Sequence, residues 1–228
     1  DSTMDMNVLK RFVPGLTDPI PWYGRLGEGI TEEKVQALIN AGYGYIWNGG
    51  VQTTPITGAG VYGSTTPDMD MLISDDKAFI PLSVLVQVET IGTVTPLEVL
   101  VSAGLGGTFA TGGTELVGRN MDTSRGDSSG MKVRSPASSA VLPTDNFGEI
   151  WRGGVPGVSV KTDSGTVSVK DHPFQFRYSA KDEGVYHVIK GKGGTLFARM
   201  NIWVAHQAMT CFIITKGLSI PKEWASGV

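Results

Sequence analysis

Hydrophobic and polar residues alternate along the second part of the chain in a pattern typical of β-strands. In FIPLSVLVQVET, which begins at Phe79, the alternation predicts one shared strand face for Ile80, Leu82, Val84, Val86 and Val88. In TLFARMNIWVAHQ it predicts another shared face, made by Leu196, Ala198, Met200, Ile202 and Val204. Pro81 lacks an amide hydrogen, so we expect it near a strand start or at an edge.

Further strand-like stretches lie between and after these two, separated by turn-forming clusters. They are LEVLVSA, Met131–Arg134, GVSVKTDSGTVSVK as a hairpin, FQFRYSA, GVYHVIKG and MTCFIIT. No alternation of strands with helices interrupts the series. The pattern predicts an all-β fold, an antiparallel jelly-roll-like β-sandwich of about eight strands over residues 79–215.

One stretch has helical spacing, TEEKVQALINAGYG at residues 31–44. Thr31 can cap its first turn, and Val35, Leu38 and Ile39 form an apolar stripe at i, i+3 and i+4. Residues 48–78 contain many glycines and threonines, which favour loops until about Met69.

Residues 1–30 contain several prolines and glycines but no regular period, which predicts an extended N-terminal arm. We expect the arm to contact its own domain or a neighbouring subunit through Val8, Leu9, Phe12, Val13, Trp22 and Tyr23. The predicted organisation is therefore an arm (1–30), a short helix with a loop-rich segment that packs on the main domain (31–78), and the sandwich (79–228).

The composition excludes some classes of function. Charged residues make up 18% of the chain, against roughly 25% in an average globular protein. The net charge of −3 provides no basic surface for phosphates, so we expect no direct binding of nucleic acid. No apolar run has the length of a membrane-spanning helix, so we expect no membrane span.

Candidate catalytic and metal-binding residues are few. Cys211 is the single cysteine and lies in an apolar run, which predicts a buried, inert thiol. The three histidines, His172, His187 and His206, do not have the spacing of metal ligands. We expect no catalytic residue, no metal and no cofactor, and the alternative is a hydrolase with a dispersed Ser-His-Asp triad.

Two polar motifs allow more than one interpretation. Asp68 and Asp70, with Asp75 and Asp76 nearby, predict a solvated turn or, alternatively, a structural cation site. Arg125-Gly126-Asp127 is a tripeptide read by many cell-surface receptors, and it lies in the polar stretch 120–139. A short motif also occurs by chance, so a solvated turn or a subunit contact is the competing interpretation.

Three segments resemble virion structural proteins of bacteriophages: FIPLSVLVQVETIGT, GGTFATGGTELVGRNMDTS and GTLFARMNIWVA. The resemblance covers about residues 79–215. It implies a jelly-roll subunit in the virion that coats or cements an icosahedral shell, commonly as a homotrimer. The implied partners are copies of itself and other capsid proteins, and the resemblance implies no catalytic residues.

Two alternatives stay open beside this hypothesis. The chain could be the major capsid protein of a tailless virus. It could also be a β-sandwich module that recognises a host receptor or a carbohydrate through loops 48–66 and 120–139.

Overall fold

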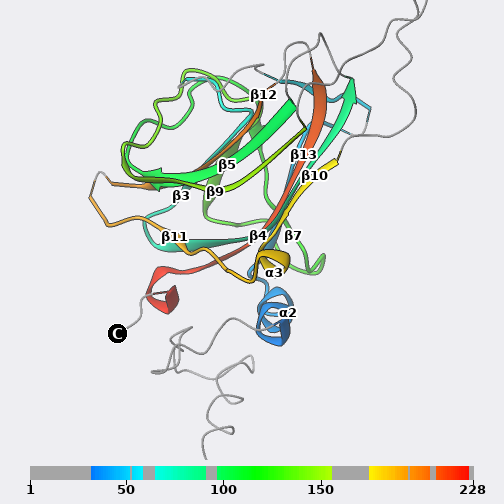
Figure 1. The fold of residues 1–228 in the computed structure, drawn as a ribbon. Coiled ribbons are helices and arrows are strands. Elements are labelled where there is room, and N and C mark those ends of the chain that lie inside the picture. The colour runs from blue at the N-terminus through cyan, green and yellow to red at the C-terminus, as the bar shows by residue number, and fades with distance from the viewer. Residues whose placement is uncertain are drawn as a thin grey trace, which may run out of the picture.

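Two antiparallel sheets pack face to face in the computed structural model, which describes residues 32–51, 53–58, 65–90, 97–155, 175–194, 196–205 and 209–225 (Figure 1). The first, here called the β4–β13 sheet, has the spatial order β10 (Gln175–Ser179), β4 (Lys77–Thr90), β13 (Thr210–Pro221), β1 (Gly44–Gly49) and β7 (Arg119–Asn120). Two short strands extend it: β11 (Ile189–Lys190) pairs with β4, and β2 (Ile56–Thr57) pairs with β13.

The second, here called the β5–β12 sheet, has six strands. Their spatial order is β6 (Glu115–Leu116), β8 (Met131–Arg134), β3 (Met69–Ile73), β12 (Ala198–Ala205), β5 (Leu97–Leu105) and β9 (Asp145–Val155). The helices are α2 (Glu32–Asn40), α3 (Ala180–Glu183) and the 3-10 turn η1 (Lys222–Ala225). Figure 1 shows all three gathered at one end of the sandwich.

The order of strand pairing is that of a jelly roll. Eight of the described strands have five or more residues, and in chain order they are β1, β3, β4, β5, β9, β10, β12 and β13. The first pairs with the eighth, the second with the seventh, the third with the sixth and the fourth with the fifth. Such nested antiparallel pairs, divided between two sheets, form a double Greek key. The predicted all-β, jelly-roll-like sandwich with one short helix is therefore confirmed.

The set of strands differs from the predicted set. β1 and β3 belong to the segment 31–78, so strands of the sandwich begin before residue 79. In GVYHVIKG, only Ile189–Lys190 is a strand, so the longer strand predicted there is wrong. The predicted hairpin GVSVKTDSGTVSVK lies outside the described residues.

The main core lies between the sheets, and a second, smaller core lies outside the β4–β13 sheet. The main core includes the inward residues of β12 that were predicted to share a face: Ala198, Met200, Ile202 and Val204. Leu38 of α2 and Ala225 of η1 close the outer core over β4 and β13. The apolar stripe of α2 packs on the β4–β13 sheet in this outer core, which accounts for the helical spacing of Val35, Leu38 and Ile39.

At a β-bulge in β4, the apolar side chains of the strand change from the outer core to the main core. Lys216 of β13 faces Ser83, but the next residue, Gly217, faces Pro81, so Leu82 is an extra residue in its strand. An extra residue reverses the alternation of side chains. Ile80 and Leu82 consequently belong to the outer core, whereas the three valines that follow, Val84, Val86 and Val88, face the main core. The prediction that all five share one face is wrong for this reason.

Candidate functional site

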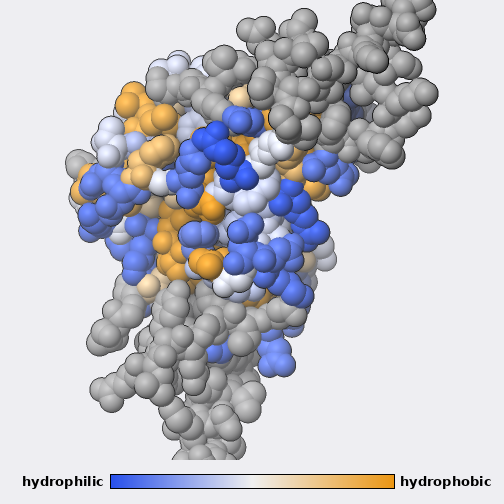
Figure 2. All heavy atoms as spheres, viewed as in Figure 1, coloured by the Kyte–Doolittle hydropathy of each residue, from blue (hydrophilic) through white to orange (hydrophobic). Residues whose placement is uncertain are grey.

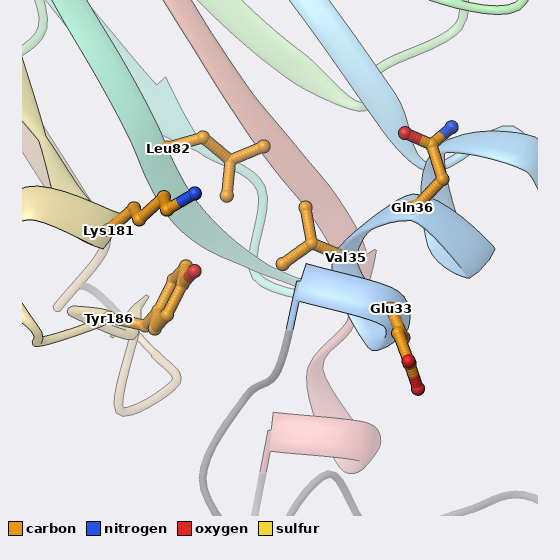
Figure 3. A pocket seen from close by; sticks show the side chains of 6 residues that line it. All are labelled: Glu33, Val35, Gln36, Leu82, Lys181 and Tyr186. Atoms are coloured by element: carbon orange, nitrogen blue, oxygen red, sulfur yellow. The ribbon is translucent and has the colours of Figure 1, made fainter.

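A surface pocket of about 500 Å³ opens beside helix α2. Its lining residues come from three elements and the loop after α3: Glu33, Val35, Gln36, Leu82, Lys181 and Tyr186. Figure 3 shows Val35 and Leu82 in the middle of the pocket and Lys181 and Tyr186 on the side across from α2. The side chains of Glu33 and Gln36 turn away from the middle of the pocket. The volume lies within the roughly 300–1,000 Å³ of pockets that hold small ligands.

The pocket forms where strand pairing is interrupted along the edge of β4 that does not face β13. β10 pairs with β4 as far as Ser83, and β11 resumes the pairing at Phe79. Between them the chain leaves the sheet as α3, which begins after the N-cap Ser179 and ends at Gly184 in the left-handed conformation. Pro81 lies in this interval, where a residue without an amide hydrogen is tolerated. Pro81 pairs with Gly217 of β13 on one edge, but neither β10 nor β11 pairs with it on the other, so it occupies a local edge position within the strand.

Leu82 and Val35 mark the place where the outer core reaches solvent. Both side chains are half-buried and pack at the border of the cluster that Leu38 and Ile80 complete. Tyr186, also half-buried, contacts both cores. The floor of the pocket is thus apolar, and its rim carries an anion at Glu33 and a cation at Lys181. Such a surface suits an apolar or aromatic group with a polar edge.

The segment that contains Arg125-Gly126-Asp127 lies at the other end of α2. Arg125 donates from Nη2 to the carbonyl oxygen of Asn40, at 3.1 Å, and from Nε to Asp122, also at 3.1 Å. The Arg125 guanidinium therefore binds one of the last carbonyls of the helix, where cations are favoured. Its side chain also fills the space beside Gly42.

Asp127 holds the neighbouring strand β7. Its Oδ1 accepts a 2.9 Å hydrogen bond from the amide of Asn120, and its Oδ2 pairs with the Arg119 guanidinium. The amide of Asn120 and the Arg119 guanidinium lower the pKa of the Asp127 carboxyl. Nearby, the Tyr45 hydroxyl donates to the Ser128 carbonyl oxygen at 2.7 Å. The charged groups of the tripeptide thus serve contacts within the chain.

The Asp68–Asp70 motif is wholly buried, so its interpretation as a solvated turn is wrong. Asp70 forms an ion pair with Arg199, with Nη2 to Oδ2 at 2.6 Å, and both side chains are fully buried. Asn201 Nδ2 and the Ala110 amide also donate to Asp70, both at 2.8 Å. Asp68 accepts from the Val204 amide at 2.6 Å.

Asp70 links the β5–β12 sheet to the loops that cover its outer face. Asp70 alternates with Met69 and Met71, which face the main core, so its side chain lies on the outer face. The loops around Ala110 and Val141 cover that face, and Arg199 Nη1 donates to the Val141 carbonyl oxygen. Within the described ranges, no three His, Cys, Asp or Glu side chains come together to hold a metal ion.

The remaining candidate residues add no reactive group to the pocket. Cys211 is buried as predicted, and burial together with the Asp68 carboxylate raises the pKa of its thiol to about 12. A thiol in this environment is unreactive. His187 is half-buried, whereas His172 and His206 lie outside the described residues, so the alternative of a dispersed triad stays a hypothesis.

The predicted interface arm, Val8 to Tyr23, also lies outside the described residues. Sequence reasoning placed Val35 and Leu82 in regular elements but did not predict the pocket that they line with Tyr186. The available signal was Pro81, because a proline inside a strongly alternating stretch indicates an interrupted ladder.

Comparison of the chain with family models, with curated proteins and with solved structures finds no match. The resemblance to bacteriophage structural proteins therefore stays a prediction. None of the helices in the described part of the chain has the length and apolar character needed to cross a membrane.

Proposed function

We propose that the chain is a viral structural protein, a capsid cement, decoration or capsid-associated subunit that stabilises an icosahedral shell in the virion by self-association. The observation that carries the proposal is the nested pairing of the eight strands, from β1 with β13 to β5 with β9. Viral capsid domains commonly use this double-sheet arrangement, and so do lectin domains, so the fold alone leaves both classes open.

The surface supports an adhesive role. Several large apolar side chains are exposed on the described surface: Val51, Val117, Val141, Phe147, Val185 and Phe197. On the face shown in Figure 2, hydrophobic surface lies between hydrophilic residues. Aromatic side chains such as Phe147 and Phe197 are enriched in the cores of protein interfaces, where charged residues are depleted.

Sedimentation of the purified chain over a range of concentrations tests this proposal. We expect association to a homotrimer, and electron microscopy of concentrated samples is expected to show ordered assemblies. A chain that stays monomeric at every concentration, and that forms no assembly, contradicts the proposal. The number of copies in a particle separates a cement subunit from a major capsid protein.

The receptor-binding alternative has less support from the geometry, because Arg125 and Asp127 are engaged by Asn40, Asp122, Arg119 and Asn120. A receptor that reads the tripeptide would have to displace these contacts. Gly126→Ala is the informative variant, since an added Cβ there meets no atom within 4 Å and should leave the fold intact. Loss of cell attachment in this variant alone favours the receptor alternative.

A further inference from the structure

The pocket beside α2 has the walls of a site for an aromatic side chain. Val35 and Leu82 offer an aliphatic surface, Tyr186 offers a ring, and Lys181 carries an ammonium group on the same side as Tyr186 (Figure 3). A cation near the face of an aromatic ring is attracted by the electrons of the ring, most strongly for indole. The combination favours tryptophan over an aliphatic group.

The position of the pocket limits which segments can reach it. Two lining residues, Glu33 and Val35, lie in the first turn of α2, which begins at Glu32. The 31 residues that precede Glu32 therefore join the described part of the chain at the edge of the pocket. Trp22 and Tyr23 are the aromatic residues of this segment that lie nearest to the helix in the sequence.

The connecting sequence allows a return to the pocket. Eight residues, 24–31, separate Tyr23 from Glu32, and a chain of this length spans at most about 30 Å. Three of them are glycines, which accept backbone angles that other residues avoid. A short connection also gives the chain's own segment a high effective concentration at the pocket, in the millimolar range for short linkers.

We propose that the pocket is the docking site for Trp22 of the same chain, and that this contact anchors the base of the N-terminal arm to its own subunit. The indole covers Val35 and Leu82 and lies against Lys181 and Tyr186. The anchor does not depend on the proposed function. The use of residues 8–13 to reach a neighbouring subunit does rest on it, because an arm fixed at Trp22 would present those residues outward.

Cross-linking of two introduced cysteines tests the anchor in the full chain. Cys211 is buried in the core and gives little background reaction. Arg25→Cys and Gln36→Cys introduce one thiol beside the docked segment and one on α2, without removing Trp22, the glycines of the connection or the apolar floor. We expect a short bismaleimide to join them within one chain, about tenfold faster than when docking is abolished.

Two variants abolish docking from opposite sides. Leu82→Asp places a charge on the floor of the pocket. Trp22→Ala removes the docked indole and changes no residue of the described sandwich. Val117→Asp is the matched control, because Val117 is 59% exposed and is not among the residues that line the pocket. It should leave the cross-linking rate unchanged, and circular dichroism should confirm that each variant folds.

Equal intramolecular rates in the parent and in Trp22→Ala overturn the proposal, because proximity along the chain would then explain the reaction. Cross-links formed only between chains also overturn it and assign the pocket to the arm of a second copy. Sedimentation of the uncross-linked protein is measured separately. A monomer with a fast internal cross-link would refute the proposed function and support the anchor. An associating protein without the cross-link would support the proposed function and refute the anchor.

Discussion

Asp70 and Arg199 form an ion pair at a depth where neither charge contacts water. Removing charges from water costs several kcal/mol per ion, and only good geometry with further hydrogen bonds offsets that cost. Here Asn201 and the Ala110 amide supply two more donors to Asp70, and Val141 supplies an acceptor to Arg199. Both charged groups therefore have further hydrogen-bond partners. Loss of either residue would leave the other charge buried without its counter-ion.

We expect Asp70→Ala to lower the free energy of unfolding by about 3–5 kcal/mol, because it leaves the Arg199 guanidinium buried without a counter-ion. Urea denaturation measures this change. Glu115→Ala is the control, since its pair with Arg134 spans 3.8 Å and the glutamate side chain is 62% exposed, so about 1 kcal/mol or less is expected. In a double variant with Arg199→Met, the total cost should be less than the sum of the single costs. An additive result contradicts the coupling of the two side chains.

The carboxyl of Asp127 makes part of the stability dependent on pH. Its pKa is lowered in the folded chain, first by the Asn120 amide and then by Arg119. A carboxyl with a lowered pKa stabilises the fold above its unfolded pKa, and this contribution is lost as the pH falls through the folded value.

Asp127→Asn should therefore reduce stability at pH 7, and its difference from the parent should disappear as the pH falls below about 4, the usual pKa of an unfolded aspartate, and through the lowered folded pKa. Thermal unfolding at several pH values measures this. Asp76→Asn is the control, because the Asp76 side chain is 73% exposed and its pair with Lys77 should contribute little at any pH. A difference for Asp127→Asn that is the same at pH 7 and at low pH would contradict the assignment.

At the scale of elements, the bulge in β4 determines which residues reach the pocket. Its formation requires close approach between β4 and β13 at Gly217. An ideal Cβ at Gly217 would lie 2.2 Å from Phe79 Cε2 and 2.8 Å from the Ile80 carbonyl oxygen. Gly217 thus leaves room for the Phe79 ring, which also packs against Trp47 at a centroid distance of 5.7 Å.

Gly217→Ala should destabilise the protein by about 1–3 kcal/mol, because the added methyl group overpacks the strand pair. Chemical denaturation measures it, with Gly148→Ala as the control, since a Cβ in that position of β9 meets no atom within 4 Å. Phe79→Leu should reduce the additional cost of Gly217→Ala, as the ring is the nearest obstacle. If both alanine variants cost the same, the close approach is not what requires glycine at position 217.

The sequence predicted elements whose patterns are local. Alternation predicted β12 and the inward half of β4, and helical spacing predicted α2. β3 was not predicted because MDMLI carries an aspartate at its second position, where burial is accepted because Arg199, 129 positions later, pairs with it. β1 was not predicted because GYIWNG is short and has a glycine at each end. The pocket depends on the bulge, which two paired strands create together.

At the scale of the whole molecule, two cores share the strands β4 and β13. Residues on one side of β13, such as Ile213, belong to the main core, whereas Leu218 and Ile220 belong to the outer core. Helix α2 and η1 cover the outer core, and Tyr43 meets Trp224 edge-on at a centroid distance of 5.0 Å. The sheets bury a larger set of side chains between themselves, so the outer layer should be the less stable part.

Leu38→Ala tests this hierarchy, because the Leu38 side chain is 3% exposed and is the fully buried residue through which α2 joins the outer core. Truncation of a buried leucine costs about 2–5 kcal/mol where the element stays folded. We expect native-state hydrogen exchange to accelerate in α2 and η1, while amides of β3, β5 and β12 keep their protection, because these strands do not contribute to the outer core. Val35→Ala, at the border of the pocket, should have the same pattern with a smaller amplitude. Equal acceleration in all strands would mean that the two cores unfold as one unit, which contradicts this hierarchy.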